Sequence, residues 1–152
     1  SNQITKGFEF AVTFKPNYNY QITSSITLQD TKTKYEGEIE IEPDFSPTIL
    51  GKINMSYLYN NTRYSLLINY LDKMKSAMDY TTFERYGEDT KNNIDISLNI
   101  QHEFTKKLSL NLHVSNLLNK DNRIPAGSSL TNFYSGAFTQ GRLGILRLNY
   151  KF

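Results

Sequence analysis

Apolar and polar residues alternate with a period of two along most of the chain, which is the pattern of a β-strand with two different faces. The clearest case is residues 94–101, where Ile or Leu stands at every even position and a polar residue at every odd one. The same alternation predicts seven strands, over residues 8–15, 20–29, 49–59, 64–70, 94–101, 108–115 and 146–152. Many approach the roughly 9–11 residues that a tilted strand needs to cross hydrocarbon.

The connections between these segments alternate in length. Short ones lie at Pro16-Asn17, Asn60-Asn61 and Thr105-Lys106-Lys107, and long ones run over about 30–47, 73–92 and 119–140. Successive connections of an antiparallel meander fall at opposite ends, so all the short turns share one end. Outer-membrane barrels have this asymmetry, with short periplasmic turns and longer extracellular loops.

Aromatic residues of the apolar positions gather at the short-turn end. They are Phe14, Tyr20, Tyr57, Tyr59, Tyr64, Phe104, Tyr150 and Phe152. Tyr and Phe are good strand formers, which explains their presence in strands but not their gathering at one end. A ring of them there is typical of the aromatic girdle at a membrane interface.

Alternation alone does not decide which face of the sheet is in contact with water, because a soluble β-sandwich or a lipocalin-like barrel shows the same alternation. The girdle, the turn asymmetry and the C-terminus favour antiparallel transmembrane β-barrel strands, and hence an all-β fold. No apolar stretch approaches the roughly 20 residues of a membrane-spanning helix. Residues 1–6 lack the profile of a signal peptide, so we expect a mature chain or a fragment.

The composition of the chain argues against several other functions. The 152 residues carry a net charge of +2, from 17 Lys+Arg against 15 Asp+Glu, which is too balanced to indicate a nucleic-acid partner. There is no Cys, so neither disulfides nor thiolate metal sites are expected. No catalytic motif surrounds the Ser residues or the two His residues, His102 and His113. We therefore expect no enzyme and no cofactor, with His113 on the polar face and His102 on the apolar one.

The first long connection carries alternating acidic residues, Glu36, Glu38, Glu40, Glu42 and Asp44. Carboxylates of this kind can form an oxygen-rich cation site. Strict alternation converges poorly on one ion, so a strand with a solvated acidic face is the favoured interpretation, and no metal site is predicted.

The long connections also hold aromatic and Arg side chains, which can bind an anionic, aromatic ligand through stacking and charge-assisted hydrogen bonds. The candidate ligand-binding residues are Tyr35, Tyr80, Phe83, Arg85, Tyr86, Arg123, Phe133 and Tyr134. The alternative is that these side chains pack the loops against one another. Lys32, Lys34, Lys73 and Lys75 can lie against lipopolysaccharide phosphates, although exposed Lys side chains usually serve only for solvation.

The end of the chain resembles a known signal. Arg147–Phe152 is similar to the β-signal of outer-membrane proteins, with Leu146, Leu148, Tyr150 and Phe152 at alternate positions. Val114–Asp121 resembles the "N-L-F-D-K" signature of TonB-dependent receptors, although Leu118 and Asn119 depart from it. Lys6–Phe10, Ser46-Pro47 and Gly141-Arg142 resemble strand starts of that family, in the same order.

This resemblance implies that residues 1–152 are the C-terminal part of a receptor barrel in the bacterial outer membrane. A complete receptor of this kind has about 22 strands around a plug, and the plug that TonB grips lies outside this chain. The implied function is TonB-energised uptake of a scarce nutrient, such as a ferric siderophore or other metal chelate. The implied partners are outer-membrane lipid and lipopolysaccharide, the other strands and plug of the receptor, TonB and the barrel assembly machinery.

Two alternatives remain at this point. A small autonomous outer-membrane barrel with a structural, adhesive or channel role fits the same strands, and a soluble ligand-binding β-barrel fits them less well. We also expect Phe152 to lie in an ordered strand paired with residues 108–118.

Overall fold

The computed structural model describes residues 2–34, 40–79, 81–126 and 134–152, and every regular element in them is a strand. The strands are β1 (Asn2–Asn17), β2 (Tyr20–Lys34), β3 (Glu40–Ile41), β4 (Ile49–Tyr59), β5 (Thr62–Leu71), β6 (Asn93–Glu103), β7 (Leu108–Ser115), β8 (Arg123–Ile124), β9 (Ala137–Phe138) and β10 (Leu143–Tyr150). A helix long and apolar enough to traverse a lipid bilayer is not found among these residues.

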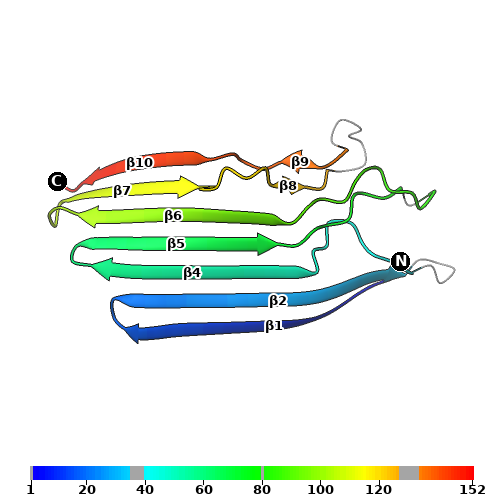
Figure 1. Ribbon diagram of the computed structural model, residues 1–152, viewed down its shortest axis with the longest axis horizontal. Coiled ribbons are helices and arrows are strands. Elements are labelled where there is room, and N and C mark those ends of the chain that lie inside the picture. The colour runs from blue at the N-terminus through cyan, green and yellow to red at the C-terminus, as the bar shows by residue number, and fades with distance from the viewer. Residues whose placement is uncertain (1, 35–39, 80, 127–133) are drawn as a thin grey trace.

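The seven long strands form one antiparallel meander in the order β1-β2-β4-β5-β6-β7-β10 (Figure 1). This confirms the predicted all-β class and the seven strands. Each of β2 to β7 pairs on both sides along this path, whereas β1 and β10 form its two edges. The remaining pieces are short: β3 pairs with β2, and β8 pairs with β9.

The register places the apolar residues of neighbouring strands side by side. Leu98 of β6 lies opposite Leu66 of β5 and Val114 of β7, and Leu112 lies opposite Leu146 of β10. Because side chains alternate between the two faces of a sheet, one face is apolar across all seven strands.

The apolar face carries no second protein layer in the part of the chain that the structure describes. Phe8 is 63% exposed and Leu146 is 68% exposed. The buried apolar residues of the described chain are Met74, Ala77 and Met78, which lie in a loop and not beneath the sheet. The predicted continuous apolar surface without a core beneath it is therefore confirmed for the described residues.

Short turns and long loops occupy opposite ends of the sheet, as predicted (Figure 1). Asn residues explain the tight turns. The Asn17 side chain accepts hydrogen bonds from the amides of Asn19 and Tyr20 at 2.9 and 3.0 Å. Asn60 has a φ of 50°, a backbone region that Asn tolerates better than most residues.

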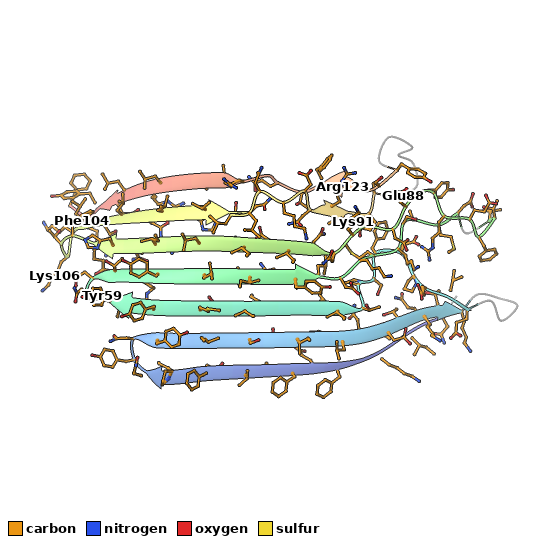
Figure 2. All side chains as sticks on the ribbon, in the orientation of Figure 1. Tyr59, Glu88, Lys91, Phe104, Lys106 and Arg123 are labelled. Carbon is orange, nitrogen blue, oxygen red and sulfur yellow. The ribbon has the colours of Figure 1, made fainter. Side chains whose placement is uncertain are left out.

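The aromatic band at the short-turn end is also confirmed, and Figure 2 shows Tyr59 and Phe104 there. Tyr57 is its centre, because its ring lies 6.4 Å from that of Tyr20 and 6.5 Å from that of Tyr64. His102 shares this face and end, with Nδ1 2.7 Å from the Thr62 hydroxyl and its ring 4.5 Å from that of Phe104.

Five of the predicted strands have other bounds in the structure, namely β1, β2, β5, β6 and β10, and the first two differ most. β1 and β2 run to 16 and 15 residues, well past the predicted 8–15 and 20–29. The extension has polar residues on both faces, so it shows no apolar alternation. It is held by the backbone ladder from Asn2–Lys34 to Lys6–Asp30 and by a 3.0 Å hydrogen bond between Thr5 and Thr31.

The prediction that Phe152 lies within the last strand is wrong. β10 pairs with β7 from Leu143–Ser115 to Tyr150–Leu108, which confirms the partner strand, but β10 ends at Tyr150. The ladder stops because β7 begins at Leu108. The Lys151 amide still donates to the Lys107 carbonyl at 2.8 Å, and the Phe152 ring packs edge-on to Tyr150 at 5.2 Å.

Candidate functional site

The long-loop end is held together by contacts between three loops. The first loop spans residues 35–48, the second 72–92 and the third 116–142. The second loop folds back on itself as an irregular hairpin. The Tyr86 amide donates to the Ala77 carbonyl at 2.8 Å, and the Thr90 amide donates to the Met74 carbonyl at 2.9 Å.

Arg85 joins the first two loops. Its guanidinium forms an ion pair with Asp44 at 3.1 Å and donates to the carbonyls of Glu42, at 2.7 Å, and Ser76. The second oxygen of Asp44 accepts a hydrogen bond from the Met78 amide at 3.1 Å. The Asp44 side chain is only 9% exposed, so its charge depends on these donors.

Lys75 makes a second connection. Its ammonium lies 3.1 Å from Asp89 within the second loop and 3.5 Å from Glu42 of the first. The hydrogen bond to Asp89 raises the pKa of Lys75. Burial acts to raise the pKa of Asp89, but hydrogen bonds from Lys75 and the Ser76 amide outweigh it and hold that pKa below its usual range.

The acidic residues of the first loop are therefore partly engaged with lysines. Glu40 lies 3.5 Å from Lys32, and Glu42 lies 3.5 Å from Lys75. Glu36 and Glu38 lie outside the described residues. Among those that the structure does describe, no group of three or more carboxylate or His side chains is arranged to hold a metal ion.

Asparagine side chains attach the third loop to β6. The Asn122 amide accepts from the Ile94 amide at 3.1 Å and donates to the Ile94 carbonyl at 2.8 Å. Asn93 makes the same double contact with the backbone of Arg123, at 3.0 and 2.6 Å. Each side chain thus replaces a backbone peptide group and continues the sheet beyond the end of β7.

The segment Val114–Asp121, which resembles a receptor signature, forms the turn that makes this attachment possible. Asn116 is 3% exposed and has a φ of 46°. Its amide group donates to the carbonyls of Lys120 and Gln140 at 3.0 and 3.2 Å. The side chain of this residue therefore fixes both ends of the third loop.

The candidate residues divide into three groups. Tyr35, Tyr80 and Phe133 lie outside the described residues. Phe83, Tyr86 and Tyr134 are 37%, 45% and 61% exposed at the loop end. Arg85 lies between the first two loops, and Arg123 stacks on Phe138, with its guanidinium carbon 3.9 Å from the ring centroid.

The structure also brings together residues that the sequence did not single out. An amide hollow of about 330 Å³ is lined by Asn69, Leu71, Asn93, Asp95, Ser115, Asn116, Asn122, Ile124, Thr139 and Gln140. A charged hollow of about 320 Å³ is lined by Glu88, Asp89, Lys91, Asn93, Asp121, Arg123 and Ser135. The recurrence of Asn between 92 and 122 is the one signal in the sequence that points to this region.

A third hollow, of about 430 Å³, lies on the polar face nearer the short turns. It is lined by Asn99, Gln101, Asn111, His113, Ile145, Arg147 and Asn149. His113 therefore lies on the polar face, as predicted.

Replacing Arg85 with Gln should loosen the first and second loops together, because Asp44 loses its cation while remaining largely buried. The local cost should be roughly 1.5–3 kcal/mol, the range for a hydrogen bond to a charged group. Hydrogen exchange in the full-length protein should speed up over residues 42–48 and 74–90 and stay unchanged in β6.

Arg63→Gln is the matched control, since Arg63 lies in β5 beside the short turns and its side chain donates to the Ser56 hydroxyl at 3.3 Å. Equal rates of hydrogen exchange over residues 42–48 and 74–90 in the two variants would contradict the assignment of Arg85 as the link between the loops.

Comparison with solved structures places this arrangement in a known architecture. The ferric-catecholate import receptor Fiu of E. coli K12 matches with a TM-score of 0.78, at 15% identity over 99% of this chain. The siderophore receptor PiuA of Acinetobacter baumannii matches with a TM-score of 0.75, also at 15% identity over 99% of the chain. The pyoverdine outer membrane receptor FpvA of Pseudomonas aeruginosa matches with a TM-score of 0.74, at 16% identity over 99%.

The fold is that of a C-terminal barrel portion of TonB-dependent siderophore receptors. The chain spans about a fifth of the length of these solved receptors, 21% of Fiu and 22% of PiuA and FpvA. No protein-family model matches the sequence, and the search of curated proteins also gave no match.

Proposed function

We propose that this chain forms the C-terminal wall and outer loops of an outer-membrane receptor for TonB-energised uptake. The cargo is a scarce nutrient, namely a ferric siderophore or another metal chelate. The observation that carries the proposal is a one-layer sheet with one apolar face and an aromatic band at its short-turn end. This sheet has the fold of siderophore receptors.

Lipid is the partner that fits the apolar face. The apolar positions of β6 run from Ile94 to Ile100, within an 11-residue strand long enough to cross the hydrocarbon. The two edges, β1 and β10, need further strands, because unpaired backbone groups are costly in a bilayer. The other strands of the same receptor supply them in this proposal, together with a plug through which TonB acts.

The extended ends of β1 and β2 fit the lipopolysaccharide layer. Lys32 and Lys34 share the parity of Leu28, so they stand on the outward side directly beyond the apolar band. Phosphates of the outer leaflet lie at that level. Lys32 also pairs with Glu40 at 3.5 Å, and Lys75 of the second loop pairs with Asp89 and Glu42, so both of these lysines share their charge with carboxylates.

The outer loops carry the ligand contacts in this proposal. Phe83, Tyr86, Tyr134 and Arg123 present aromatic rings and a cation at the loop end, with Tyr35, Tyr80 and Phe133 as further candidates. Arg85 positions the loops. No catalytic role is assigned to any residue.

Uptake of iron-labelled chelates by cells that carry the full-length receptor tests this proposal. Uptake should require a proton gradient and TonB. The combined change Phe83→Ala, Tyr86→Ala and Tyr134→Ala should lower chelate affinity at unchanged surface abundance, because stacking contacts are lost.

Tyr18→Ala is the control, since Tyr18 is 84% exposed in the turn between β1 and β2 at the opposite end. Uptake that survives loss of TonB, or a triple variant that binds every chelate as well as the native protein does, would contradict the proposal.

A further inference from the structure

The charged hollow lies where the second and third loops meet. Glu88 and Lys91 come from the second loop, Asp121 precedes β8, and Arg123 begins it. Figure 2 shows Glu88, Lys91 and Arg123 close together at the loop end. The Glu88 amide donates to the Tyr134 carbonyl at 2.9 Å, and the Ser135 hydroxyl donates to the Glu88 carboxylate at 3.3 Å. The two loops are therefore in direct contact beside the hollow.

The backbone at this junction is too close for an ordinary side chain. A Cβ placed on Gly87 would lie 2.2 Å from the Tyr134 carbonyl oxygen, so only Gly allows the loops to approach in this way. Gly136 has a φ of 85°, which also favours Gly. The walls of the hollow are thus set by backbone packing and not by mobile side chains alone.

The charges that line the hollow fall into two classes. Asp89 is balanced by Lys75 at 3.1 Å. Lys91, Arg123, Glu88 and Asp121 face the same hollow, yet among the described residues no ion pair joins either cation to either carboxylate. Two positive and two negative groups therefore remain available to a ligand.

This arrangement of two cations and two carboxylates disfavours a ligand whose charges all have the same sign. A polyanion is attracted by Lys91 and Arg123 but repelled by Glu88 and Asp121, and a polycation meets the reverse. A ligand that carries one group of each sign gains from all four. Its charged groups would also form charge-assisted hydrogen bonds, which are the stronger kind.

The adjoining amide hollow adds a second requirement. The two hollows share Asn93, and the amide hollow is lined by side-chain amides and hydroxyls together with Asp95, Leu71 and Ile124. The amides of Asn93, Asn116 and Asn122 are engaged with backbone groups. The side-chain amides of Asn69 and Gln140 are therefore the ones that can bind an uncharged ligand body with amide groups. Each hollow is at the lower end of the roughly 300–1,000 Å³ that small-molecule sites occupy.

We propose that the charged hollow and the amide hollow together bind a zwitterionic, amide-bearing ferric chelate in preference to a polyanionic one. Lys91 and Arg123 receive the anionic group of the chelate, and Glu88 and Asp121 receive its cationic group. This rests on the proposed uptake function and specifies the class of its ligand.

Equilibrium binding to the full-length receptor on de-energised cells tests the proposal with three probes. The first is a ferric trihydroxamate with no free charges. The second is the same chelate bearing one free ammonium and one free carboxylate. The third is a trianionic ferric tris-catecholate. The zwitterionic probe should bind about ten-fold or more tightly than the neutral one, the factor expected for one net charge-assisted hydrogen bond.

Lys91→Gln and Asp121→Asn are the informative variants, because neither side chain makes a hydrogen bond or ion pair within the described residues. Each should lower the affinity for the zwitterionic probe about ten-fold and leave the neutral probe unchanged. Asp121→Asn should strengthen binding of the tris-catecholate. Lys106→Gln, in the turn before β7, is the control and should change none of the three affinities.

The outcomes separate the two proposals. If chelates bind but the zwitterionic probe gains nothing over the neutral one, or the tris-catecholate binds most tightly, the assigned ligand class is wrong while the uptake function stands. If the two variants weaken both hydroxamate probes equally, they act through loop structure and the assignment is again wrong. If none of the probes binds to a receptor present at the surface, the uptake proposal fails, and this inference with it.

Discussion

Replacing Leu98 with Arg should destabilise the receptor barrel in lipid by about 2–4 kcal/mol, the cost of a lipid-facing cation near the bilayer midplane. Leu98 lies midway along the apolar positions of β6, opposite Leu66 and Val114, so it is far from both interfaces. Its side chain would have to carry a charge through the apolar face or distort the sheet. Reversible unfolding of the full-length protein from lipid vesicles measures this free energy.

Asn99→Arg is the matched control, one residue along the same strand. Asn99 points to the polar face, where it accepts a 3.0 Å hydrogen bond from Asn111 and lines the 430 Å³ hollow. The free energy of unfolding of the control should fall by about 1 kcal/mol, because that hydrogen bond is lost. Equal losses in the two variants would show that the faces of β6 have been assigned to the wrong environments.

The strands were predictable because every second side chain of a strand lies on the apolar face of the sheet and must therefore be apolar. Residues 108–115 alternate without interruption, and residues 49–59 do so apart from Leu50 and Leu58; the structure begins and ends β7 and β4 at those residues. β1 and β2 extend further through backbone pairing around Thr5 and Thr31, where polar residues on both faces leave no apolar alternation in the sequence. β3, β8 and β9 have two residues each, too few for any period to appear.

The loop site was predictable in composition but not in arrangement. The sequence marked Arg85 and Arg123 as cations of the long loops, yet their surroundings depend on distant residues. Arg85 lies against Asp44, 41 positions away. Arg123 is held by Asn93, 30 positions away. No local pattern encodes such contacts, and the charged hollow is lined by segments that are far apart in the sequence.

Deleting Phe152 should lower the amount of receptor in the outer membrane far more than it lowers chelate affinity per folded receptor. Phe152 lies beyond the end of β10, fully exposed, and its one ring contact is with Tyr150 at 5.2 Å. Such a contact is worth only about 0.5–1.5 kcal/mol, and Phe152 lies at the opposite end of the sheet from the loops. Phe152 makes so little contact with the described residues that its ring is available for recognition during assembly, as the resemblance to the β-signal implies.

Three variants separate recognition from stability. Phe152→Tyr keeps an aromatic ring and should preserve surface abundance, whereas Phe152→Lys should lower it as the deletion does. Phe138→Lys changes an exposed ring at the loop end, where Phe138 is 59% exposed, and should leave abundance unchanged. Surface abundance is measured by labelling intact cells, and stability by unfolding protein refolded into vesicles. If Phe152→Lys lowers abundance only in proportion to its loss of stability, the terminal residue acts through packing with Tyr150, and the assembly machinery is not reading it.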